Sequence, residues 1–172
     1  MQGAFAPTFD APIDDVRATL DVNVIGVLMV LQAFARALMA EGRPGAVVNT
    51  ASMAGLAGPP NMVGYTASKA AVIGLTLSAA KDLAPHAIRV NAVSPAYIGP
   101  GAMWSNQVAE QARVPSRYYG DDTATVEAQM IEQIPMRRYG GLDEVASAVA
   151  FLLSDDASYL TGVNLEVAGG VR

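Results

Sequence analysis

The sequence predicts an α/β fold in which helices flank a parallel sheet. Helical and strand-like segments alternate along the chain, and such an alternation is typical of parallel α/β architectures. The strand candidates, residues 46–50, 88–93 and 163–167, are short and rich in β-branched residues. The first of them has the continuous apolar character of a strand that is buried on both faces.

The number of predicted strands is small for a sheet of this kind. Only three are found, and the first predicted element is a helix with no strand before it. We therefore expect residues 1–172 to form one partial domain whose N-terminal part is missing. The 46–50 strand would then lack a neighbour and expose an apolar edge, which favours aggregation.

The first helix is predicted between Ile13 and Glu41. Acidic residues in its first turn interact favourably with the positive end of the helix dipole, and Pro44 prevents the helix from continuing. Apolar residues recur at helical spacing throughout: Val16, Leu20, Val24, Val27, Leu28, Leu31, Phe34 and Leu38.

Further helices are expected at residues 66–83, 123–133 and 142–153, with a Gly- and Pro-rich loop at 52–64. Apart from the 123–133 helix, the segment 96–135 reads as irregular. A segment of this length inside a compact domain usually covers a site, so we predict that 96–135 is a substrate lid.

Composition excludes several classes of function. The chain carries a net charge of −5, which disfavours binding to nucleic acid. It has no cysteine and a single histidine, His86, so neither a disulfide framework nor a zinc site is expected. Paired acids at 121–122 and 155–156 read as solvated helix ends and loops, and we predict no metal. No signal peptide is evident, and polar residues interrupt the apolar stretch Val22–Leu38, so a cytoplasmic protein without a membrane span is expected.

The candidate chemistry is carried by Tyr65, Lys69 and Ser52. Tyr65 and Lys69 are four residues apart and therefore share one helix face. A tyrosine that acts as a base near neutral pH needs its pKa lowered by about 3 from its usual 10, or about 4 kcal/mol, and a nearby ammonium group and a helix N-terminus both favour the phenolate. Ser52 follows a predicted strand, at the edge of the sheet where such folds bind ligands.

The alternative interpretation is that Tyr65 and Lys69 lie on the surface of a helix without a catalytic role, since Y-x-x-x-K occurs on many such helices. The placement of Ser52 thirteen residues before Tyr65, at a strand end, favours the catalytic interpretation.

Longer motifs resemble the short-chain dehydrogenase/reductase family, in order and across essentially the whole chain. They are Asn23-Val24-Ile25-Gly26, Val48-Asn49-Thr50-Ala51-Ser52, Tyr65-Thr66-Ala67-Ser68-Lys69-Ala70-Ala71, Ile88-Arg89-Val90-Asn91-Ala92-Val93-Ser94-Pro95, Leu160-Thr161-Gly162 and Val167-Ala168-Gly169-Gly170. The resemblance implies a Rossmann-like parallel sheet, a nicotinamide cofactor and a homo-oligomer, either a dimer or a tetramer.

The resemblance also implies roles for individual residues. Tyr65 would be the general acid/base, Lys69 would lower its pKa and bind the nicotinamide ribose, and Ser52 would polarise the reacting oxygen. Asn23 would hold a water that relays protons through Lys69. Pro95 and the Ile98 backbone amide would lie against the nicotinamide.

The chain also departs from the family pattern. Ala96 stands where the family usually has glycine, and Gly99-Pro100-Gly101 replaces a region that usually holds a threonine. A following loop in place of a helix start argues against a phosphate-binding role for this tripeptide. The Gly-rich strand–turn–helix that binds pyrophosphate, the acidic residue that binds the adenosine ribose, and the N-N-A-G turn are not found.

A narrower resemblance is to bacterial NAD-dependent xylitol (polyol) dehydrogenases, carried by segments around residues 2–7, 52–62, 95–104 and 135–140. It implies a sugar alcohol or ketose substrate and favours NAD, with NADP not excluded. Gln2, Tyr97 and Trp104 are candidates for the polyol pocket, together with Ser52. The alternatives, in which Trp104 packs the lid and Tyr97 the loop core, stay open.

Two hypotheses follow from the sequence. The first is an oxidoreductase, or its catalytic portion. The second is a non-catalytic, dimerising module that cannot bind NAD on its own but retains the first two predicted helices, which the family resemblance implies pair across a dimer axis.

Overall fold

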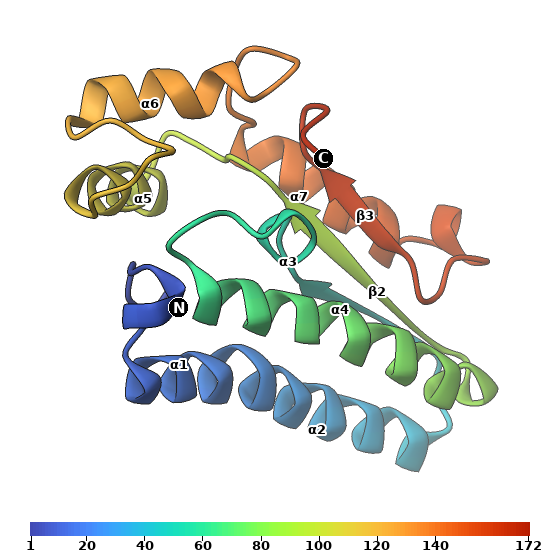
Figure 1. Cartoon of the computed structure of the whole chain (residues 1–172). Helices are drawn as coiled ribbons and strands as arrows, with labels where there is room; N and C mark the ends of the chain where they lie inside the picture. Colours follow the sequence, from blue (N-terminus) through green and yellow to red (C-terminus); the bar gives the residue numbers. More distant parts are fainter.

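The computed structural model describes all residues, Met1–Arg172. Its centre is a three-stranded parallel sheet in the order β1-β2-β3 (Figure 1). Val93 is the register partner of Thr50 in β1, and Ala92 is the partner of Asn164 in β3. The strands are β1 (Gly45–Thr50), β2 (Ile88–Pro95) and β3 (Asn164–Val167). The predicted α/β class, the parallel sheet and the three strand positions are confirmed.

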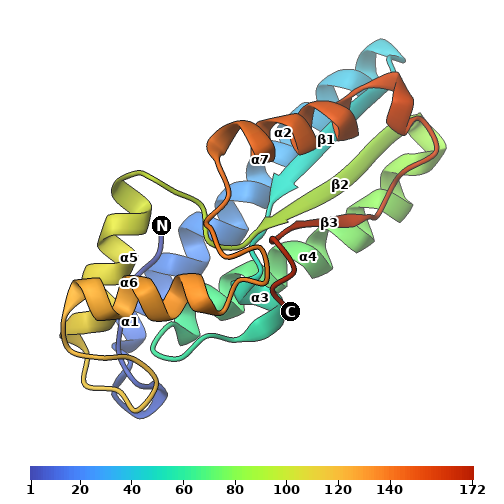
Figure 2. The ribbon, with the colours of Figure 1, turned by 90° about the horizontal axis from the view of Figure 1, so that it is seen from above.

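Helices cover both faces of the sheet. A continuous helix, made of α1 (Ile13–Leu20), the π-helical η2 (Asp21–Ile25) and α2 (Gly26–Glu41), lies beside α4 (Val63–Leu83) on one face. Helix α7 (Leu142–Leu153) lies on the other, as Figure 2 shows. The predicted limits of the first and last helices are confirmed.

The first helix ends at Gly42, whose φ of 62° is a left-handed conformation that glycine adopts without strain. The π-helical turn in its middle was not predicted, because the apolar spacing of the segment is that of an ordinary α-helix. This turn contains the buried Asn23.

Two predicted loops contain helices. Helix α3 (Ala54–Ala57) forms inside the 52–64 loop, and α4 begins at Val63 rather than at residue 66. In the 96–135 segment, α5 (Ala102–Arg113) precedes the expected α6 (Thr123–Glu132). The prediction that a loop follows Gly99-Pro100-Gly101 was therefore wrong. The helix there is stabilised by packing against α6, which a single-segment pattern does not reveal.

Helices α5 and α6 form a unit beyond the C-terminal ends of the strands (Figures 1 and 2). The unit has a small apolar core of its own: Trp104, Val108, Tyr119, Val126 and Met130. The main core lies between α2, α4 and the sheet, and includes Leu31, Leu38, Ala80, Ile88 and Val90.

Strand β1 is not buried on both faces as its sequence predicts. Only Asn49 is buried, while residues 45–48 are partly exposed. The physical reason is that β1 is an edge strand with β2 on one side only. An open groove of about 680 Å³ runs between this edge and α2.

The helix spanning Ile13–Glu41 also has an exposed apolar side. Its most exposed large side chains include Val30, at 72%, and Met29, at 64%. By length and composition alone this helix could cross a membrane, a test that core helices of soluble proteins also pass; 22% of its most apolar window is buried.

Candidate active site

The candidate site is built where β1 ends and α4 begins. Ser52 follows β1 and is buried, at 8% exposure. Its Oγ accepts a hydrogen bond from the Ala54 amide at 3.1 Å and lies 3.4 Å from the Pro95 carbonyl oxygen. These two contacts, from the turn into α3 and from the end of β2, hold the Ser52 side chain between two strand ends.

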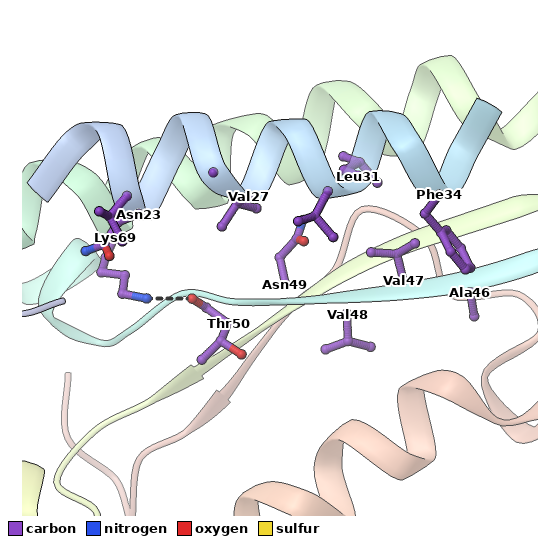
Figure 3. A pocket seen from close by; sticks show the side chains of 13 residues that line it. Asn23, Val27, Leu31, Phe34, Ala46, Val47, Val48, Asn49, Thr50 and Lys69 are labelled. Carbon is purple, nitrogen blue, oxygen red and sulfur yellow. Dashed lines mark hydrogen bonds between the residues drawn. The ribbon is translucent and has the colours of Figure 1, made fainter. Parts of the chain in front are cut away.

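Tyr65 and Lys69 lie on the first turns of α4. The Lys69 Nζ donates to the Thr50 carbonyl oxygen at 2.7 Å (Figure 3) and lies 5.6 Å from the centre of the Tyr65 ring. The predicted common helix face is therefore present. Sequence reasoning missed the Thr50 carbonyl, although its place just before Ser52 on the same strand was the available signal.

The predicted depression of the Tyr65 pKa is not present in this arrangement. Burial raises the pKa of Tyr65 above its ordinary value of 10.0, and the smaller effect of the Ser52 hydroxyl lowers it. Burial also lowers the pKa of Lys69 from 10.5. The physical reason is that the loss of solvent disfavours both charged forms, and the ammonium group of Lys69 is directed at Thr50.

A close approach between α3 and α4 sets the position of Lys69. A Cβ atom on Gly55 would lie 2.6 Å from the Ala70 nitrogen and 2.7 Å from the Lys69 carbonyl carbon. Only glycine permits this contact between two backbones. Sequence reasoning did not single out Gly55, because a glycine in a Gly-rich loop is usually explained by the turn itself.

Asn23 lies at the Lys69 end of the groove (Figure 3). Its Nδ2 donates to the Met1 carbonyl oxygen at 2.8 Å and to the Ser68 Oγ at 3.0 Å, and its Oδ1 accepts from the Met1 amine at 3.1 Å. The side chain thus joins the N-terminal segment to α4, and the proposed water relay through Lys69 stays a prediction.

The residues present fit one end of a nicotinamide cofactor. Pro95 ends β2 and Ile98 follows it, and the Ile98 amide donates to no group within the chain. Lys69, bonded once to Thr50, retains further N–H donors. For the pyrophosphate and adenosine end, the chain contains no strand–glycine turn–helix element.

Gln2 and Tyr97, two of the residues predicted to bind substrate, make different contacts within the chain. Gln2 contacts Gln107 and Asn106 of α5 at 3.3 Å each. The Tyr97 hydroxyl donates to the Gln133 side chain at 3.0 Å. Burial raises the pKa of this hydroxyl to well above its usual range.

Trp104 is buried, at 5% exposure, inside the α5–α6 unit. Its Nε1 donates to Glu127 at 2.9 Å, and its ring lies edge-on to Tyr97. These contacts are those of a packing residue, so the role of Trp104 in a polyol pocket stays a prediction.

Comparisons with known proteins agree with this arrangement. Residues 2–172 match the family model described as enoyl-(acyl carrier protein) reductase. Human (3R)-3-hydroxyacyl-CoA dehydrogenase is 38% identical over 158 residues, which are 92% of this chain and 54% of that protein.

Two solved structures are similar over nearly the whole chain. An NAD⁺-bound xylitol dehydrogenase is 55% identical, with a TM-score of 0.96, and the match covers 99% of this chain and 65% of that one. An NADP-bound dehydrogenase from Agrobacterium tumefaciens is 34% identical, with a TM-score of 0.84, over 98% of this chain and 63% of that one. The chain therefore spans between about half and two thirds of these relatives.

Proposed function

Because this chain belongs to the short-chain dehydrogenase/reductase family, we propose that it is the catalytic portion of a nicotinamide-dependent dehydrogenase for a sugar alcohol, such as xylitol, or its ketose. The observation that carries the proposal is the convergence of Ser52, Tyr65 and Lys69 at the strand ends. The likeness to an NAD⁺-bound xylitol dehydrogenase supports the substrate class and favours NAD over NADP.

The roles of the side chains follow from their chemistry. In the oxidising direction, the substrate hydroxyl transfers its proton to the Tyr65 oxygen, and a carbonyl forms as the hydrogen on the same carbon leaves as hydride. The nicotinamide ring, when bound, supplies the hydride acceptor. Ser52 holds the substrate oxygen against Tyr65, and Lys69 stabilises the phenolate while it binds the ribose.

The raised pKa of Tyr65 bears on which protonation state of its hydroxyl is available at a given pH. A protonated tyrosine is suited to donate a proton to a ketose carbonyl, whereas oxidation requires the phenolate. We therefore propose that oxidation by this site rises with pH through the range in which Tyr65 ionises, while reduction does not.

The test is a chimera in which the N-terminal third of the NAD⁺-bound xylitol dehydrogenase precedes this chain. Xylitol oxidation, followed as NADH formation, is expected in the chimera, and Tyr65→Phe should lower kcat by at least about 10²-fold with NAD binding retained. A chimera that binds NAD but keeps its turnover after Tyr65→Phe would remove Tyr65 from the role of acid/base.

A second candidate function is a non-catalytic module that associates with another polypeptide. The exposed β1 edge and the apolar side of α2 favour it. Turnover in the chimera distinguishes the two, since a non-catalytic module gives none. The chain alone is expected to bind NAD at least about tenfold more weakly than the chimera, and micromolar binding by the chain alone in a calorimetric titration would contradict this expectation.

A further inference from the structure

The loop in front of α4 contains a residue in an unfavourable backbone conformation. Asn61 has a φ of 65°, in the left-handed region, and it is one of three non-glycine residues with positive φ in the chain. Asparagine tolerates this region better than most residues, but the conformation still needs support from its surroundings. Tyr65 follows four residues later, so the Asn61 turn determines how α4 begins.

The support comes from Gln111, in the last turn of α5. Its side chain is fully buried, at 0% exposure. Its Oε1 accepts a hydrogen bond from the Asn61 Nδ2 at 3.0 Å, and its Nε2 donates to the Pro60 carbonyl oxygen at 3.1 Å. The oxygen and the nitrogen of the Gln111 amide thus bind two consecutive residues of one turn, Asn61 and Pro60.

Three segments meet at this turn. The Ala6 amide of the N-terminal segment donates to the Asn61 carbonyl oxygen at 3.0 Å. Phe5, Met62 and Val114 form a small buried cluster, and the Tyr65 ring packs against it. Because Val114 directly follows α5 and Met62 is the cap of α4, the position of α5 bears on the position of Tyr65 through both polar and apolar contacts.

We propose that Gln111 is a positioning residue for Tyr65: it holds the Pro60–Asn61 turn in its left-handed form and so couples the α5–α6 unit to the first turn of α4. The structural half of this proposal concerns the turn alone. Its catalytic half rests on the proposed function, in which Tyr65 transfers the proton. Substrate contacts that fix the position of the α5–α6 unit would thereby also fix the position of the Tyr65 hydroxyl.

The experiment uses the full chain with Gln111→Leu, which replaces the amide by an apolar side chain of similar size and so removes both hydrogen bonds. The readout is amide exchange of Thr66, whose N–H donates to the Met62 carbonyl oxygen at 2.8 Å as the first bond of α4. We expect exchange at Thr66 to become at least about tenfold faster, since two polar groups of the turn lose their partner. In the chimera, kcat should fall by at least about tenfold, with the KM for NAD changed less than twofold.

A suppressor separates positioning from simple packing. Adding Asn61→Gly to Gln111→Leu should restore both Thr66 protection and kcat, because glycine adopts positive φ without a side-chain anchor. Leu152→Ala, a buried change in α7 on the other face of the sheet, is the control: it should lower stability without a selective effect at Thr66. Should Gln111→Leu fail to fold, Asn61→Ala removes the same bond from the other side and should also accelerate Thr66 exchange.

The outcomes separate the two proposals. Unchanged Thr66 exchange in Gln111→Leu and Asn61→Ala overturns the positioning role, as does a defect that Asn61→Gly leaves uncorrected. A chimera without dehydrogenase activity overturns the proposed function, while Thr66 exchange in the chain still decides the role of Gln111.

Discussion

At the scale of single residues, the site depends on backbone positions as much as on reactive side chains. Lys69 is held by the Thr50 carbonyl oxygen, and the approach of Gly55 leaves no room for a side chain next to Lys69. Two glycines in this part of the chain allow the point to be tested, because Gly74, further along α4, has no atom within 4 Å of a built Cβ.

We expect Gly55→Ala to lower the free energy of unfolding by about 1–3 kcal/mol, because the added methyl group meets rigid backbone. Gly74→Ala is the matched control and should raise it by about 0.5–1 kcal/mol through its higher helix propensity. Denaturant unfolding of both variants measures the difference. Equal effects of the two substitutions would show that the backbone around Gly55 moves to accept a methyl group without loss of stability.

At the scale of elements, α7 illustrates how an acidic residue stabilises a helix start. Glu144 lies in its first turn, accepts from the Gly141 amide at 2.7 Å and pairs with both terminal nitrogens of Arg138 at 2.8 Å. The hydrogen bonds from Arg138 and Gly141 lower the pKa of Glu144 from 4.5 to about 2.

The sign of the resulting pH dependence follows from this shift. The unfolded chain binds a proton at Glu144 near pH 4.5, whereas the folded chain does so only near pH 2. The contribution of Glu144 is therefore complete above pH 4.5 and is lost as the pH falls toward 2. We expect the Glu144→Gln variant to lose less stability than the unmodified chain as the pH falls from about 5 to about 2, as measured by thermal unfolding. Parallel pH profiles would contradict this account.

At the scale of the whole molecule, the dominant feature is the open side formed by the β1 edge and α2. Parallel strands are normally covered on both faces and paired on both sides, whereas β1 is paired with β2 alone. Figure 3 shows Val27, Leu31 and Phe34 of α2 beside Val47 of β1 along this groove. An open apolar surface next to an unpaired edge favours association with another polypeptide.

We expect the chain alone to self-associate through this side. Val30→Lys places a charge on the groove at a residue that is 72% exposed, so folding should be unaffected and association should weaken by at least about tenfold. Phe9→Lys, at 86% exposure and outside the groove, serves as the control. Sedimentation velocity over a range of concentrations measures both. An equal response of the two variants would place the association surface elsewhere.

Much of the fold was accessible from sequence because it depends on local patterns. Helical spacing between Ile13 and Glu41, and the residues that terminate that helix, predicted its limits, and β-branched runs located all three strands. The pattern did not predict α5, because that helix is stabilised by its contacts with α6. The unpaired edge of β1 was predicted from the small number of strands, whereas the partial exposure of its residues 45–48 was not, because the apolar run alone indicates burial on both faces.

The sequence by itself determined the fold class and the family, and it predicted Ser52, Tyr65 and Lys69 as the candidate site, because motif spacing and side-chain chemistry are local properties. Only the tertiary structure decided the pKa directions, which depend on burial, and the contacts of Thr50 and Gly55 with Lys69. It also decided that Gln111 supports the Asn61 turn, fifty residues away in sequence. Contacts between distant segments follow from the packing of whole elements, which no local pattern encodes.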